Sequence, residues 1–175
     1  MKNILSFFAL AATVLSAAFA TTDAEAATRR AVWSNAAGGV TANTMTGRLG
    51  PYGGGVLRGR SVSTDALGNA TAASHGVVRG RNGGFGQRSG STMRNADGSA
   101  SHQSAFSGSS ARGSISSSGG ATRDAMGNVS QSRGTTATNA VTGNSIQATR
   151  SYNSATGATR TATCYNASGA VISCR

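Results

Sequence analysis

Arginine dominates the chemistry that this sequence offers. From residue 27 onward the chain contains fifteen Arg, three Asp and neither Lys nor Glu, a net charge of +12. Guanidinium groups form bidentate hydrogen bonds with phosphate and carboxylate, so we expect affinity for anionic polymers such as DNA, lipopolysaccharide or acidic polysaccharide. The predicted contacts are two pairs with members 27 residues apart: Arg123 with Arg150, and Arg133 with Arg160. The alternative is that dispersed arginine only keeps strand edges soluble.

Groups that could catalyse a reaction are few. His75 and His102 each follow a Ser, and Asp65 or Asp97 could orient them as in a hydrolytic triad. The chain contains 25 Ser, so such adjacency arises by chance, and no GxSxG sequence is present. We therefore predict that the protein is not an enzyme and has no cofactor, metal site or small-molecule substrate.

The two cysteines, Cys164 and Cys174, are candidates for a disulfide. If residues 166–169 closed a four-residue hairpin turn, Cys164 would pair with Val171 and Cys174 would lie opposite Thr161, on the other face. The sulfur atoms would then be too far apart to bond. The cysteines therefore close a loop in place of a hairpin, or bond between chains, or stay reduced, and we favour the closed loop.

Residues 1–26 have the features of a secretory signal peptide. Lys2 precedes an apolar stretch, and small residues at the end allow cleavage after Ala20 or Ala26. The apolar stretch is too short to span a membrane, and no later stretch approaches the necessary length. We therefore expect no transmembrane segment in the mature chain and a secreted protein, located in the periplasm, on the cell surface or outside the cell.

One turn signature recurs along the chain: Asn or Asp, a small residue, then Gly three or four positions after the first. Asn or Asp caps its own backbone, and Gly accepts a positive φ, so each copy predicts a chain reversal. The spacing predicts a unit of about 14 to 15 residues, sharp in the C-terminal third and looser in the middle. The copies are Asp65 with Gly68, Asn95 with Gly98, Asp124 with Gly127, Asn139 with Gly143, Asn153 with Gly157, and Asn166 with Gly169.

Between the turns, residue types alternate with period two, as in β-strands. Thr159, Thr161 and Thr163, for example, would share one face. No window beyond residue 35 has the 3.6-residue apolar period of a helix. The alternation and the turn spacing predict strands of about six to ten residues. Glycines within these segments, such as Gly76 and Gly108, argue against long regular strands.

Large apolar side chains are scarce, since Leu, Ile, Val and Phe make up only 17 of the 149 residues after residue 26. Such a composition, combined with high net charge, favours disorder over a hydrophobic core. We therefore predict an all-β fold of short repeated strands, a β-solenoid or a meander, that is partly disordered. The predicted domains are the signal peptide, a Gly-rich N-terminal segment at 27–60 and the β-repeat region at 61–175.

Two stretches, Tyr152-Asn-Ser-Ala-Thr-Gly157 and Tyr165-Asn-Ala-Ser-Gly169-Ala-Val171, resemble the core of YD-type (RHS) β-repeats. That family has Asp where this chain has Asn, and a longer period. The composition, rich in Gly, Ser, Asn and Thr, also resembles that of curli-type fibre subunits, although their Gln/Asn ladder is absent. Both resemblances imply a secreted β-repeat protein.

Two functions agree with these features. The first is a secreted structural or adhesive β-repeat protein of the cell surface or extracellular matrix, which associates with itself and forms amyloid-like fibres. The second is a largely disordered cationic protein that binds anionic polymers of the envelope or matrix. No signature of a known nucleic-acid-binding fold is present.

Overall fold

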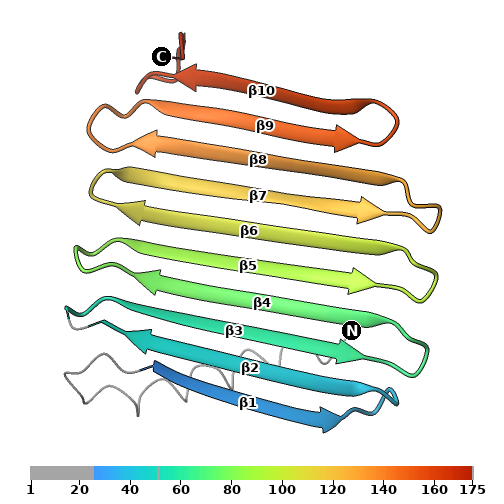
Figure 1. Ribbon diagram of the computed structural model, residues 1–175. Coiled ribbons are helices and arrows are strands. Elements are labelled where there is room, and N and C mark those ends of the chain that lie inside the picture. The colour runs from blue at the N-terminus through green and yellow to red at the C-terminus, as the bar shows by residue number, and fades with distance from the viewer. Residues whose placement is uncertain (1–25, 51, 175) are drawn as a thin grey trace.

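The computed structural model describes residues 26–50 and 52–174, which form one antiparallel sheet of 11 strands (Figure 1). Strand order in the sheet follows strand order in the chain. The predicted signal peptide lies outside the described residues, apart from Ala26. In chain order the strands are β1 (Ala26–Ser34), β2 (Val40–Leu49), β3 (Gly55–Thr64), β4 (Ala70–Arg79), β5 (Phe85–Arg94), β6 (Ala100–Ser110), β7 (Gly113–Arg123), β8 (Val129–Asn139), β9 (Ser145–Asn153), β10 (Gly157–Tyr165) and β11 (Val171–Ile172).

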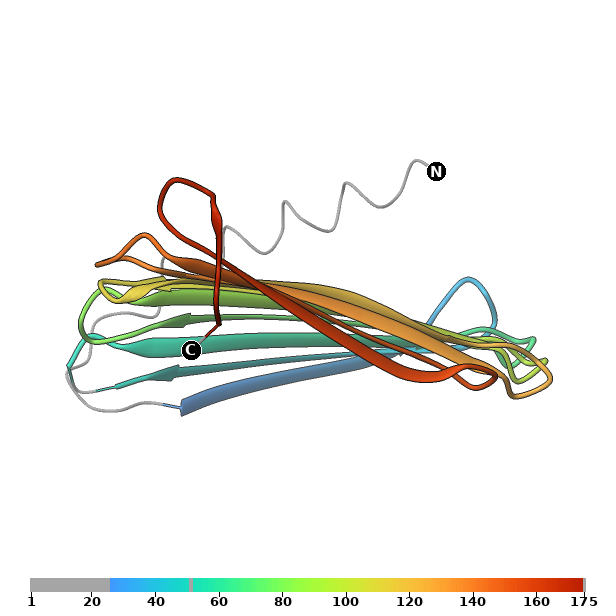
Figure 2. The ribbon, with the colours of Figure 1, turned by 90° about the horizontal axis from the view of Figure 1, so that it is seen from above.

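The sheet is a single twisted layer, and no second layer of described residues covers either face (Figure 2). No hydrophobic side chain is buried in the described part of the chain. The residues that are buried there are three mid-strand glycines, Gly59, Gly76 and Gly86. None of the described residues forms a helix that could cross a membrane. Backbone ladders and contacts between neighbouring side chains, and not a core, therefore define the shape.

The predicted all-β repeat fold is confirmed, and it takes the form of a meander. The boundary predicted at residue 60 falls within β3, and the same strand-and-turn unit continues on both sides of it. The described residues form strands and turns throughout, so the partial disorder expected from the composition is not seen among them.

The ten long strands have 9 to 11 residues each, so the expectation that internal glycines would prevent long strands was wrong. Neighbouring side chains cover several of these glycines. Arg58 and Arg88 lie beside Gly76, with their Cγ atoms 3.6 and 3.4 Å from the position a Cβ would take. The ring of Phe106 covers Gly108 in the same way. Side chains on the neighbouring strands or two residues away on the same strand therefore replace the contacts that glycine lacks.

Eight of the ten connections between the described strands contain five residues and not four; the β6–β7 connection has two and the β9–β10 connection has three. In the first turn, Oδ1 of Asn35 accepts hydrogen bonds from the N–H groups of Ala37 and Gly39, at 3.0 and 3.1 Å. The backbone N–H of Asn35 donates to the carbonyl of Gly39 at 2.9 Å. Gly38 has a φ of 75°, which glycine adopts without strain. The unit is thus Asn-x-x-Gly-x, whose fifth residue belongs to the turn.

All twelve predicted turn residues lie at chain reversals or at the strand ends beside them. The six predicted glycines have φ between 68° and 92°. The same conformation recurs every 15 residues at Gly38, Gly53, Gly68, Gly83 and Gly98, whereas from Gly127 the intervals are 16, 14 and 12. The expectation of a sharper period in the C-terminal third was therefore wrong. The N-terminal turns share one backbone conformation, but their first residue is Asn, Asp or Gly. The 15-residue repeat is therefore hard to recognise from residue types alone.

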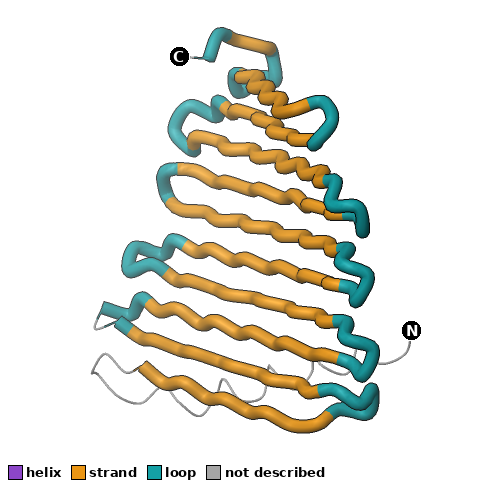
Figure 3. The backbone as a smooth tube through the Cα atoms, turned by 45° about the vertical axis from the view of Figure 1, so that its right-hand side comes forward, coloured by secondary structure: helices purple, strands orange, loops and turns teal. Residues whose placement is uncertain are grey.

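Strand alternation places every second turn at the same end of the sheet (Figure 3). These turns contact each other. The N–H of Ala66 donates to the carbonyl of Ala37 at 2.9 Å, and the N–H of Ala96 donates to Oδ1 of Asn69 at 2.9 Å. The second position of the signature is Ala because this residue lies against the neighbouring turn. The turns beginning at 35, 65, 95, 124 and 153 share this end.

The turn carboxylates make stability depend on pH. Hydrogen bonds from the side chain and backbone of Asn69 lower the pKa of Asp65, and those from Asn128 lower the pKa of Asp124. The stabilisation that these hydrogen bonds give the folded state is fully present above the ordinary carboxyl pKa. It is lost as the pH falls through the lowered pKa values of the two aspartates. We therefore expect the Tm to fall below about pH 4.

The variant Asp65→Asn/Asp124→Asn keeps a capping oxygen, as Asn35 does, and should lose much of this acid sensitivity. Melting curves followed by circular dichroism from neutral to acid pH would measure it. Identical pH profiles for the variant and the wild type would contradict the assignment.

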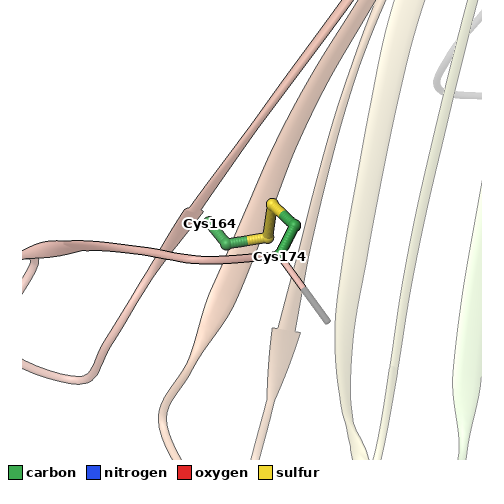
Figure 4. Close-up of a disulfide and its surroundings, with 2 residues drawn as sticks. All are labelled: Cys164 and Cys174. Carbon is green, nitrogen blue, oxygen red and sulfur yellow. A yellow bond between two sulfur atoms is a disulfide. The ribbon is translucent and has the colours of Figure 1, made fainter.

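The C-terminal hairpin also has a five-residue connection, 166–170, so Cys164 pairs with Ile172. A shift of one residue reverses the face of every side chain that follows. The disulfide joins Cys164 to Cys174, with Cα atoms 5.3 Å apart (Figure 4). The inference that a hairpin excludes this bond was wrong, because it assumed a four-residue turn. The predicted loop that a Cys164–Cys174 disulfide closes is present.

Candidate anion-binding face

The strand register assigns every strand residue to one of two faces. Directly paired residues point to the same side of an antiparallel sheet, and successive residues alternate. Ten of the twelve arginines within strands lie on one side, which we call the arginine face; only Arg29 and Arg79 lie on the other. The ten residues are Arg30, Arg48, Arg58, Arg60, Arg88, Arg94, Arg123, Arg133, Arg150 and Arg160.

One row of residues crosses the middle of the arginine face from β1 to β10, perpendicular to the strands, and we call it the central row. It contains five arginines, and three of them occupy adjacent strands in direct register. The row is Arg30, Thr44, Arg60, Ser74, Gly90, Ser104, Gly119, Arg133, Arg150 and Arg160.

The three adjacent arginines are in direct register, and Arg150 and Arg160 place like charges opposite each other, whereas the Arg133 guanidinium is directed toward β6. Arg133 pairs with Arg150, and Arg150 pairs with Arg160. Neighbouring strands lie about 4.7–4.9 Å apart, and opposed like charges destabilise a sheet. All three side chains are exposed and stand in the middle of their strands. A bound anion would remove this repulsion, so the arrangement is suited to anion binding.

Hydrogen bonds hold the Arg133 side chain across two strands. Its guanidinium donates to Oγ of Ser117 at 3.1 Å and to Oγ of Ser104 on β6. Gly119 lies on β7, the strand between β6 and β8, and pairs with both Ser104 and Arg133. The missing side chain at Gly119 leaves room for the arginine, so one charge of the row is fixed in place before any ligand binds.

The opposite side, which we call the hydroxyl face, carries uncharged side chains over its C-terminal half, most of them Ser, Thr, Gly or Ala. From β5 to β10 the register places no charged residue on it. A shallow depression of about 700 Å³ lies over β4 to β9, lined partly by these side chains. A typical row across this face is Gln87, Ser107, Ser116, Thr136, Gln147 and Thr163.

The four predicted contact arginines share one face, but they are not all together. Arg133, Arg150 and Arg160 are neighbours in the central row, whereas Arg123 pairs with Val129, four residues from Arg133 along β8. At about 3.3 Å per residue, this separation is about 13 Å along the strand direction. Arg123 therefore belongs to the face but not to the group of three.

The residues considered for catalysis are dispersed. His102 lies on the arginine face, where its Nδ1 is 2.8 Å from Oγ1 of Thr92. His75 lies on the hydroxyl face and covers Gly59. Asp65 and Asp97 lie in turns, where they accept backbone hydrogen bonds. The two His side chains therefore point to opposite sides of the sheet.

The sequence interpretation missed the N-terminal arginines of this face. Six arginines of strands β1 to β5 share it, and all have even numbers: Arg30, Arg48, Arg58, Arg60, Arg88 and Arg94. The five-residue connections between β1 and β6 preserve this parity from strand to strand, so a count with period two would have found these arginines.

No protein-family model matches the sequence, and neither a curated protein nor a solved structure matches it.

Proposed function

We propose that this is a secreted structural β-repeat protein of the cell surface or extracellular matrix, whose copies stack through their hydroxyl faces. The observation that carries the proposal is the segregation of charge: ten strand arginines lie on one face, and the other has no charge from β5 to β10. Stacking would leave the arginine face outward, available for adhesion.

The hydroxyl face suits a second copy of the chain. Its Ser, Thr, Gly and Ala side chains are short, so a facing sheet can approach closely. Six strands of about ten residues cover roughly 900 Å², and a stable interface needs about 800 Å² from each partner. Exposed Phe85, on the same face, would supply an apolar group for a facing depression. The close-packed interior that one copy lacks would then form between two copies.

The test compares two neighbouring positions on β8. Ser132 lies on the hydroxyl face and Gln131 on the arginine face, and both are exposed. Ser132→Arg would place an unpaired charge in the interface and should weaken association at least about a hundredfold. Gln131→Arg adds the same charge on the other side and should leave association unchanged. Light scattering after size exclusion measures the mass of each.

Electron microscopy of the same samples tests fibre formation. A wild-type protein that stays monomeric at all concentrations would reject the proposal. Filaments that persist in Ser132→Arg would reject stacking and point instead to strand addition at the sheet edges.

A further inference from the structure

We propose that Arg133, Arg150 and Arg160 form a binding site for a linear acidic polysaccharide that crosses strands β8 to β10. The site lies on the arginine face, opposite the proposed stacking surface. The proposal goes beyond self-association and does not depend on it.

The spacing of the arginines fits an extended chain with regularly repeated anions. Register partners on adjacent strands place one guanidinium stem about every 4.7–4.9 Å along the central row. This distance is comparable to the length of one pyranose ring in an extended glycan. Each guanidinium can form two hydrogen bonds with a carboxylate or sulfate. A uronic-acid chain along the row would thus meet Arg160 and Arg150 at neighbouring sugars and the Arg133 guanidinium farther along, over β7 and β6.

The surroundings of the three arginines provide further contacts for sugars. Tyr152 is two residues from Arg150 on β9, so it shares the face, and its ring is exposed. It pairs with Gln131, whose amide can donate to or accept from a sugar hydroxyl. Thr135, beside Arg133, adds a hydroxyl group, which is 2.9 Å from Oγ of Ser117. One flat ring among many polar groups suits a pyranose with axial hydrogens and hydroxyl groups.

These features favour a glycan over a single-stranded nucleic acid. Surfaces that bind single strands usually stack successive bases on several aromatic rings. From β6, which the Arg133 guanidinium reaches, to β10, the register places Phe106 and Tyr152 on the arginine face, on strands three apart and too distant to stack successive bases. A nucleic acid would therefore gain phosphate contacts but little stacking.

Arg133 acts as a preorganised anchor in the site. Its guanidinium already bonds to Ser117 and Ser104, so binding costs less side-chain entropy there than at a free arginine. The nearest carboxylate in sequence, Asp124, lies in the β7–β8 turn and accepts hydrogen bonds from Asn128. Asp124 therefore does not compete with a ligand for the arginines in the middle of the central row.

The experiment measures binding of oligogalacturonate to the full mature chain by isothermal titration calorimetry at low salt. The test variant is Arg133→Gln/Arg150→Gln/Arg160→Gln. The matched control, Arg29→Gln/Arg79→Gln/Arg112→Gln, removes three charges from the hydroxyl face and a turn. We expect the test variant to bind roughly 10- to 100-fold more weakly, as loss of three exposed charge pairs implies. The control should bind within about twofold of wild type.

Equal weakening in both variants would show attraction by net charge alone and overturn the site. A fully methyl-esterified oligogalacturonate, which carries no charge, should not bind; if it bound equally well, the arginine contacts would be rejected. A thymidine oligonucleotide of equal charge should bind more weakly than oligogalacturonate, and tighter binding would overturn the choice of glycan. The test variant should assemble like wild type, so failure of this site and failure of stacking are distinguishable.

Discussion

Gly119→Ala should destabilise the sheet by about 1–3 kcal/mol, the usual cost of forcing an extra methyl group into a closely packed position. A Cβ at Gly119 would collide with the carbonyl oxygen of Ser132 and lie 2.8 Å from Cα of Arg133. Both are backbone atoms, so β7 and β8 would have to move apart. The same shift would displace the Arg133 guanidinium from Ser104, and chemical denaturation followed by circular dichroism measures the loss of stability.

Gly134→Ala is the matched control for this prediction. Gly134 also lies mid-strand, on β8, but no neighbouring atom lies within 4 Å of a Cβ built there. The substitution should be neutral or should stabilise the protein by up to about 1 kcal/mol, because alanine restricts the unfolded chain more than glycine does. Equal destabilisation by the two substitutions would mean that the close contact between β7 and β8 is not what makes Gly119 necessary.

Ala105→Pro should disrupt the middle of the sheet. Ala105 pairs with Ser89 on β5 and with Ser118 on β7, so it lies within a strand that has neighbours on both sides. Proline cannot donate to the ladder and is confined to edge strands and bulges. We expect amide hydrogen exchange in β5, β6 and β7 to accelerate at least about a hundredfold, equivalent to roughly 3 kcal/mol.

The effect should remain local, because each strand contacts only the strands next to it in the described chain. Protection in β2 and β9 should therefore stay near the wild-type level, as in repeat proteins with nearest-neighbour stability. Ala125→Pro serves as the control, because Ala125 is the second residue of a turn, where proline is favoured. A uniform loss of protection across all strands in Ala105→Pro would show that the sheet unfolds as one unit.

The sequence was sufficient to predict the strands and turns because their causes are local. Asn or Asp caps a turn through its own side chain, and Gly permits the positive φ, as Asn35 and Gly38 illustrate. The period-two alternation within strands likewise follows from neighbouring residues. For these reasons the all-β repeat and the turn positions followed from the sequence.

The faces were harder to predict because they depend on the length of each connection. The regular five-residue turn, such as residues 35–39, keeps the parity of the residue number on a face, whereas the β6–β7 and β8–β9 connections reverse it. Arg94 and Arg123 therefore share a face although one number is even and the other odd. The cysteine argument failed for the same reason, since it counted four residues where the turn has five. The contacts of Arg133 with Ser117 and Ser104 depend on register across three strands, which no local pattern shows.

The order of the strands has a mechanical consequence. β1 and β11 lie at opposite edges of the sheet (Figure 1), so a force pulling residues 26 and 174 apart would load the ladder bonds of one strand at a time. Unzipping of this kind requires less force than shearing many bonds together. The protein would therefore lengthen gradually under tension, as one strand after another detaches from the sheet. Only the segment between Cys164 and Cys174 would resist extension, because a covalent bond closes it.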